Sequence, residues 1–138
     1  PEKAARDALG AASNYLVAAN WWDATLSDPA SKTFIDKFRA ANNGDTPEWY
    51  SALGYETAVV LFDAIQRAGS LDHTKVRDAL ASTNLTGQLV VGGTVKFKDN
   101  GQIDNAYLMT QNLPNQKVAL IYPKELATAD PMVPLPKQ

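Results

Sequence analysis

The stretch TPEWYSALGYETAVVLFDAIQRAG, residues 46–69, constrains the fold more than any other part of the chain. Pro47 suits the first position of a helix, where its missing N–H removes no hydrogen bond, and Thr46 suits the N-cap before it. Gly69 suits the position just after the last helical turn. The sequence therefore predicts a long helix over residues 47–68.

The polar residues of this helix are confined to one narrow stripe. At 100° per residue, Glu56, Asp63 and Arg67 fall on one side, and Asp63 and Arg67 have the i,i+4 spacing of an ion pair. We expect this stripe to be the solvated face. Apolar side chains occupy most of the remaining circumference, so we expect other structure to cover the helix on more than one side.

The other elements have clear but shorter signals. Ser27 or Asp28 can cap a helix over 28–42, and a third amphipathic helix is expected over 72–82. Residues 1–9 favour helix, Tyr15–Ala19 is typical of a short buried strand, and TNLTGQ is expected to be a loop. VVGGTVKFKDNGQI predicts a β-ribbon, and residues 107–113 and 117–122 predict an antiparallel hairpin around Pro114-Asn115.

Composition excludes several classes of protein. The chain has 138 residues, 45% of them hydrophobic and 20% charged, which is typical of one modest globular domain or a piece of a larger one. A net charge of −2 without a Lys/Arg cluster argues against a nucleic-acid surface. There is no cysteine, so no disulfide or thiolate chemistry is available. No apolar run approaches the roughly 20 residues of a transmembrane helix.

No constellation of residues predicts catalysis, a metal or a cofactor. The single histidine, His73, is expected at the start of a surface helix. Asp23, Asp28 and Asp36 are better explained by capping and solvation than as an acid/base group. Gly92-Gly93 lacks the following helix of a phosphate loop and is interpreted as a turn or bulge. We expect a protein that is not an enzyme.

Two aromatic pairs resist a purely structural interpretation. Trp21 and Trp22 follow a buried strand, and Trp49 and Tyr50 begin a helix. Each pair can belong to a core cluster or a hydrophobic staple. Alternatively, they can line a concave small-molecule site, because such sites in α/β proteins collect beyond strand ends and at helix N-termini, which also favour anionic groups.

The order of several segments resembles one known family. These segments are DPASKTFIDKFRAANNGDTPEWYSALGYETAVVLFDAIQRAGS, then VRDAL, then GGTVKFKDNGQ, and finally MTQN with KVALIYPKELATADP. Together they resemble the C-terminal part of extracytoplasmic solute-binding proteins of the branched-chain amino acid (Leu/Ile/Val) type, which serve ABC importers. Tyr55-Glu56-Thr57 departs conservatively from the Tyr-Asp-Ala of many relatives. The chain is much shorter than whole receptors, and it begins without Met or a signal segment, so we expect its N-terminus to be processed or missing.

The resemblance implies an α/β fragment of the two-lobe type I periplasmic-binding-protein fold, with Rossmann-like lobes and a ligand cleft between them. Residues 1–20 would belong to lobe 2, 21–103 to lobe 1, 104–123 to a hairpin that returns to lobe 2, and 124–138 to an extended proline-rich tail. The chain would then contain two of the three crossings between lobes.

The resemblance also implies ligand-binding residues. Tyr50 matches a family position that contacts ligand, and Trp21 and Trp22 lie just past a lobe crossing, where side chains can line the cleft. The loops that bind a ligand carboxylate would belong to the missing N-terminal portion.

The favoured hypothesis is therefore a periplasmic or surface-anchored receptor component that closes around a small amino acid-like or aromatic, carboxylate-bearing solute and docks on a permease. A ligand-sensing regulatory domain of the same fold and a lobe of an α/β enzyme are the alternatives. The short chain is expected to self-associate or to pair with the missing N-terminal portion, since exposed strand edges seek partners.

Overall fold

A computed structural model describes residues 2–104 and 106–136. The ranges predicted for lobe 2, the returning hairpin and the tail include residues 1, 105, 137 and 138, which lie outside the described residues. The described chain contains both helices and strands, which confirms the α/β class. They are α1 (Lys3–Leu9), the 3₁₀ turn η1 (Gly10–Ser13), β1 (Val17–Asn20), α2 (Pro29–Ala41), α3 (Trp49–Ala68), α4 (His73–Ala81), β2 (Asn84–Thr86), β3 (Thr94–Lys96), β4 (Leu108–Asn112), β5 (Val118–Tyr122) and η2 (Lys124–Leu126).

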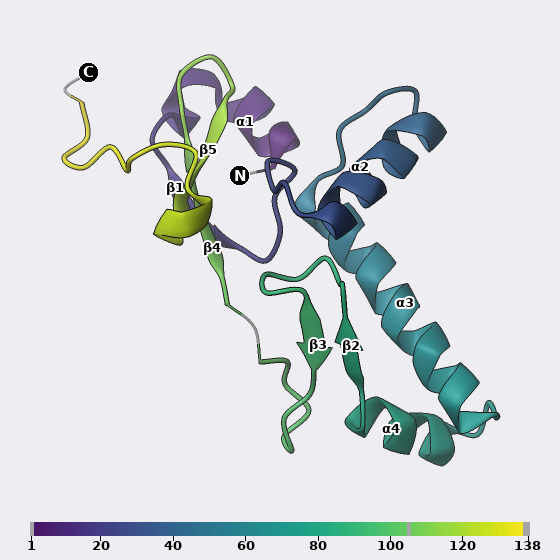
Figure 1. Cartoon of the computed structure of the whole chain (residues 1–138). Helices are drawn as coiled ribbons and strands as arrows, with labels where there is room; N and C mark the ends of the chain where they lie inside the picture. Colours follow the sequence, from purple (N-terminus) through teal and green to yellow (C-terminus); the bar gives the residue numbers. More distant parts are fainter. Residues whose placement is uncertain (1, 105, 137–138) are drawn as a thin grey trace.

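The two ends of the chain build one half of the molecule, which we call the sheet half (Figure 1). Its three strands are antiparallel in the order β1-β4-β5, with Asn20 opposite Leu108 and Thr110 opposite Leu120. The predicted hairpin is confirmed, because β4 and β5 pair directly around a turn in which Asn115 has a φ of 64°. β4 is the central strand, and most of its side chains are buried.

The middle of the chain builds the other half, which we call the helical half (Figure 1). It contains α2, α3, α4 and an antiparallel ribbon in which Leu85 of β2 lies opposite Val95 of β3. Within the segment predicted as a ribbon only one isolated bridge forms, between Phe97 and Ile103, and the strand that pairs with β3 lies in the segment that we expected to be a loop. Gly92 and Gly93, with φ values of 86° and 67°, form the predicted turn between the two strands.

Side-chain caps explain where two helices begin. The Asp28 carboxylate accepts a hydrogen bond from the Ser31 N–H at 2.9 Å, and Asp72 accepts one from the Lys75 N–H at 3.1 Å. Each bond satisfies a backbone donor that the first helical turn leaves without a partner. The sequence had allowed Ser27 or Asp28 as the cap of α2, and the structure shows Asp28.

The start of α3 differs from the prediction. The helix begins at Trp49, with Glu48 in the N-cap position and in an extended conformation. The Thr46 hydroxyl instead accepts a hydrogen bond from the Arg39 guanidinium at 3.2 Å, and Pro47 is buried. The Thr46 side chain, which the local sequence favoured as the cap of α3, therefore binds α2 instead.

The prediction that the polar stripe of α3 is the solvated face was wrong at Glu56, whereas Arg67 is exposed and Asp63 is partly exposed. Glu56 is only 5% exposed and is covered by the segment that follows β2. The predicted ion pair between Arg67 and Asp63 is present at 2.7 Å, but the Arg67 guanidinium also donates to the Ala79 carbonyl at 2.7 Å and to the Thr83 hydroxyl at 2.9 Å. The polar stripe thus binds α4 and the start of the ribbon.

The opposite, apolar face of α3 lies at the surface of the described structure. Tyr55, Leu61 and Phe62 are 48%, 40% and 68% exposed. We expected cover on more than one side, and within residues 2–104 and 106–136 α3 is covered on its polar side. The buried stripe of α3 thus contains Glu56 together with the apolar residues Ala52, Val60 and Ala64, while the larger apolar side chains of the helix are exposed.

Buried apolar side chains form two clusters. The larger cluster joins the two halves, because it combines Leu108 and Leu120 of the sheet with residues of the loop after β1, of α2, of α3 and of the ribbon turn. The smaller cluster, Val60, Val90 and Val95, lies between α3 and the ribbon. Among the helices described, each is too short or too polar to cross a bilayer.

Candidate functional site

Four aromatic side chains from three parts of the chain meet where the sheet half joins the helical half, and we call them the aromatic cluster. The Trp21 ring centroid lies 5.6 Å from that of Trp49 and 6.0 Å from that of Tyr107. Trp49 and Tyr50 pack edge to face with their centroids 6.0 Å apart. Tyr50 and Tyr107 are 54% and 55% exposed, and Trp21 is 37% exposed. These distances are typical of interacting aromatic pairs.

Strand register explains why Trp21 and Tyr107 meet. Asn20 lies opposite Leu108 at the end of the β1–β4 ladder, so Trp21 and Tyr107 are the next pair beyond it. The Trp21 N–H donates to the Asn20 side-chain oxygen at 3.0 Å, which holds the chain as it leaves the strand. Sequence reasoning did not include Tyr107 in the site. Pairing the strand at 15–19 with the one at 107–113 would have identified it.

Trp22 lies in the core, although it is the immediate neighbour of Trp21. It is 2% exposed, its indole N–H donates to the Ser31 hydroxyl at 2.9 Å, and its ring packs edge to face on Phe34 with centroids 5.6 Å apart. Of the three predicted ligand-binding residues, Trp21 and Tyr50 thus lie in the exposed aromatic cluster, and Trp22 lies beneath it in the larger hydrophobic cluster. Ligand binding by all three stays a prediction.

A small polar pocket of about 280 Å³ lies next to Trp49, between the two halves. It is lined by α1, the end of β1, the 23–25 loop and the start of α3. The Glu48 carboxylate accepts the Lys3 backbone N–H at 3.2 Å across it. Basic and acidic side chains both line the pocket, so it can hold a polar group of either charge.

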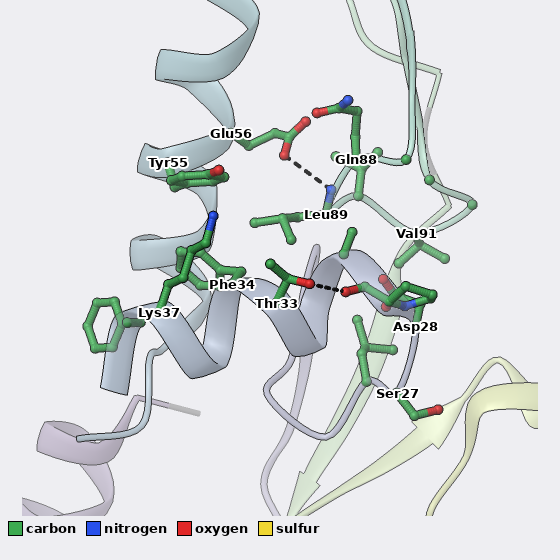
Figure 2. Close-up of a pocket in the computed structure, with 18 of the residues that line it drawn as sticks. Ser27, Asp28, Thr33, Phe34, Lys37, Tyr55, Glu56, Gln88, Leu89 and Val91 are labelled. Carbon is green, nitrogen blue, oxygen red and sulfur yellow. Dashed lines mark hydrogen bonds between the residues drawn. The ribbon is translucent and has the colours of Figure 1, made fainter. Parts of the chain in front are cut away.

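A second, larger hollow of about 1010 Å³ lies between α2 and the ribbon turn at 87–93, with Tyr55 and Glu56 of α3 at one end (Figure 2). We call it the α2–α3 groove. Its walls are mainly apolar, with Phe34 and Phe38 from α2 and Leu89, Val90 and Val91 from the ribbon turn.

Glu56 is the buried polar group of this groove. Its Oε2 accepts the Leu89 N–H at 3.1 Å, as Figure 2 shows. Its Oε1 is buried and has no hydrogen-bond partner among the described residues. Burial raises the pKa of Glu56 above its ordinary value of 4.5, and the hydrogen bond from Leu89 opposes that rise.

The titratable residues that could support catalysis have other roles. Asp28 caps α2, Asp23 accepts hydrogen bonds from the N–H and hydroxyl of Thr25, and Asp36 is exposed. His73 is the exposed first residue of α4. Within the described part of the chain, no group of three His, Cys, Asp or Glu residues could hold a metal ion.

Comparison with known proteins identifies the architecture. The family model described as "Periplasmic binding protein" matches residues 3–117. Leu/Ile/Val-binding protein homolog 7 of Brucella abortus is 26% identical over 112 residues, which are 80% of this chain and 28% of that protein. Homolog 8 of the same organism is 24% identical over 106 residues, 76% of this chain and 26% of its own length. The chain thus spans less than a third of the length of these relatives.

Solved structures share the fold. The leucine-binding protein LivK of Thermotoga maritima has a TM-score of 0.73 and 25% identity over 86% of this chain and 33% of its own. An ABC transporter substrate-binding protein of Desulfitobacterium hafniense, solved with Leu, has a TM-score of 0.68 and 16% identity over 86% of this chain and 38% of its own. A solute-binding protein of R. palustris, solved with benzoate, has a TM-score of 0.69 and 15% identity over 84% of this chain and 31% of its own.

These neighbours are solute-binding proteins, two of them described as parts of ABC transporters, and such proteins are not enzymes. The helices, small sheets and segment order of this chain match a part of the type I fold that they share. Because the family model covers most of the sequence, the chain belongs to the periplasmic binding protein family, and it is similar to a part of Leu/Ile/Val-binding protein homologues.

Proposed function

We propose that the chain forms part of the receptor of an ABC importer and that the aromatic cluster supplies one wall of its solute site. The observation that carries this proposal is the position of the cluster. Trp21 and Tyr107 lie on the two segments that connect the sheet half to the helical half, and Trp49 and Tyr50 begin α3 beside them. A site at such a junction changes shape when the two halves move relative to each other.

The two halves support the lobe assignment. β1, β4 and β5, from the segments assigned to lobe 2, form one sheet, whereas α2, α3, α4 and the β2–β3 ribbon come from the segment assigned to lobe 1. We propose that these halves are parts of the two lobes, that 124–136 is an appendage of lobe 2, and that a solute stabilises the closed arrangement by its higher affinity for it.

The chemistry of the wall indicates the class of solute. Four rings and no buried cation within the aromatic cluster suit a planar aromatic or branched aliphatic group, while a carboxylate would need donors from elsewhere in the receptor. Leucine and benzoate, each bound by a structural neighbour, fit this description. We propose a periplasmic or membrane-anchored location and delivery of the solute to the permease.

The test uses the complete receptor and measures leucine and benzoate binding by calorimetry. Tyr50→Ala is expected to weaken binding by about 1–3 kcal/mol, the scale of a lost aromatic contact, and to leave the ligand-free melting temperature nearly unchanged. Trp49→Ala is expected to do the reverse, because Trp49 is half-buried and packs on two other rings.

Tyr122→Ala is the matched control, since Tyr122 is a tyrosine of the same exposure, 55%, on β5. It is expected to change neither quantity. If Tyr50→Ala binds both probes normally but melts at a much lower temperature, Tyr50 is a core residue and the proposed wall is wrong. If the unaltered receptor binds neither probe, the proposed solute class is wrong.

A further inference from the structure

The Glu48 carboxylate joins α1 to the start of α3. Both of its oxygens accept the backbone N–H of Lys3, each at 3.2 Å, although the two residues are 45 positions apart in the sequence. α1 belongs to the sheet half, where the Gln116 side chain, in the turn between β4 and β5, donates to the Arg6 carbonyl at 3.4 Å (Figure 1). Glu48 immediately precedes α3 in the helical half. The bond therefore crosses the junction between the two halves.

Neither helix uses these two groups for its own hydrogen bonding. Lys3 is the first residue of α1, so its N–H has no acceptor within that helix. Glu48 occupies the N-cap position of α3, but its side chain makes no capping bond there. Each half can therefore form its own helix without this contact, and the contact acts on how the two halves are arranged.

The surroundings of the bond allow it to break and form again. Glu48 is half-buried, Lys3 is exposed, and both line the small polar pocket of about 280 Å³ between the halves. Water can replace either partner when the halves separate, whereas separation of the larger hydrophobic cluster would expose apolar surface. Since a hydrogen bond is lost beyond about 3.5 Å, a relative movement of about 1 Å is enough to break this one.

We propose that the bond between Glu48 and Lys3, which we call the latch, forms when the lobes close and breaks when they open. This inference rests on the proposed function, because it takes the two halves as parts of lobes that move. The latch stabilises the closed arrangement without contacting the solute, whose proposed wall begins at the next residue, Trp49. Glu48 is thus a positioning residue. Its loss raises the dissociation constant of every solute by the factor by which it lowers the equilibrium constant for closing.

Calorimetry on the complete receptor, with leucine and with benzoate, measures the latch. Glu48→Ala is expected to weaken both affinities by the same factor, about two- to fivefold, the scale of a partly exposed hydrogen bond to a charge. Lys3→Pro is expected to have the same effect, because proline lacks the N–H. Proline suits this position, since Lys3 is the first helical residue and Glu2, with φ of −62° and ψ of 140°, has the extended conformation that proline favours in the residue before it.

Two further variants separate the latch from other effects. Lys3→Ala keeps the backbone N–H but removes the side chain and its ion pair with Asp7, and it is expected to bind both solutes like the parent. The double variant Lys3→Pro/Glu48→Ala is expected to bind no more weakly than either single variant, because both changes remove the same bond. Thermal melts without solute check that every variant is folded.

A measurement without solute follows the two halves directly. Lys75→Cys on α4 and Lys117→Cys in the turn between β4 and β5 place spin labels at exposed positions on different halves, and this chain has no cysteine of its own. The distribution of distances between the labels in the ligand-free receptor gives the closed population. Glu48→Ala and Lys3→Pro are expected to reduce that population, and Lys3→Ala is expected to leave it unchanged.

Three results with the solutes would overturn the latch. They are parent-like affinities in both Glu48→Ala and Lys3→Pro, a loss for leucine that differs from the loss for benzoate and so indicates direct contact with the solute, and additive losses in the double variant. If the unaltered receptor binds neither probe, the proposed solute class is wrong, and the distances between the labels decide the latch alone. An unchanged closed population in both single variants would then overturn it, so the two failures are distinguishable.

Discussion

The Glu56 carboxylate lies beneath the ribbon turn, where the Leu89 N–H binds one oxygen and the other oxygen is buried. Removal from water disfavours the charged form, and a single backbone hydrogen bond opposes this only in part, so the pKa is raised. At the same scale, Trp21 and Trp22 are adjacent in sequence but differ in burial, 37% against 2% exposed. The Trp22 indole N–H donates to the Ser31 hydroxyl, whereas the Trp21 ring packs against the rings of Trp49 and Tyr107.

The raised pKa of Glu56 predicts how the stability of the short chain changes with pH. Below the unfolded-state pKa, near 4.5, Glu56 is protonated in both states. Above it, the unfolded state releases the proton while the folded state retains it, so unfolding releases a proton and higher pH favours unfolding. The contribution of Glu56 to the free energy of unfolding is therefore full below 4.5 and is lost as pH rises through the raised folded-state pKa.

Urea unfolding of the parent and of Glu56→Gln between pH 4 and pH 8 measures this contribution. We expect the free energy of unfolding of Glu56→Gln to increase relative to that of the parent as pH rises. Glu48→Gln is a suitable control, because Glu48 is a partly exposed carboxylate immediately before the same helix. A pH-independent difference for Glu56→Gln would contradict the prediction.

At the scale of elements, α2 connects the groove to the core. Phe34 and Ile35 point into the larger hydrophobic cluster, and Ser31, in its first turn, binds Trp22. The helix starts at Pro29 because Asp28 accepts the Ser31 N–H, so one short segment sets both the cap and the position of the Trp22 partner. The formation of α3 depends on both local sequence and contacts with distant segments. Its length follows from local sequence, and its orientation follows from Arg67 and Glu56 binding the backbone of later segments.

Removal of the α2 cap gives a second prediction. Asp28→Ala is expected to lower the free energy of unfolding by about 1 kcal/mol, the usual effect of losing an N-cap acceptor. Asp28→Asn retains an acceptor and is expected to recover most of it. Asp36→Ala removes an exposed aspartate from the same helix and is expected to have little effect or to stabilise slightly, since alanine has the higher helix propensity. Equal losses for Asp28→Ala and Asp36→Ala in urea unfolding would show that the cap bond does not stabilise α2.

At the scale of the whole molecule, one hydrophobic cluster joins the two halves. Leu108 and Leu120 of the sheet, both almost fully buried, share it with Phe34 of α2 and Ala52 of α3. The segment after η2 is also attached to the sheet, because the buried Gln111 side chain donates to the Met132 carbonyl at 3.3 Å and accepts its N–H at 2.8 Å. The segment around Met132 is thus attached to β4.

A shared cluster predicts cooperative unfolding. Leu120→Ala is expected to lower the free energy of unfolding by about 2–5 kcal/mol and to reduce hydrogen-exchange protection in both halves. Val95→Ala, in the smaller cluster between α3 and the ribbon, is expected to have a smaller effect that is greatest in the helical half. Loss of protection confined to β1, β4 and β5 in Leu120→Ala would show instead that the halves unfold independently.

The amino-acid pattern was enough to predict the α/β class, the helices α2, α3 and α4, the C-terminal hairpin, the Gly92-Gly93 turn and the family, because periodicity, caps and turn residues act over a few neighbours and segment order is visible directly. Four features could be seen only in the folded molecule: which side of α3 is covered, which residue of the Trp21-Trp22 pair is buried, that Tyr107 joins the aromatic cluster, and that residues 84–86 form a strand. Each of these depends on contacts between residues far apart in the chain. The hydrogen bond between Glu56 and Leu89, 33 residues apart, is the clearest case, because the residues around Glu56 in the sequence do not predict that a backbone N–H from a distant segment will bind its carboxylate.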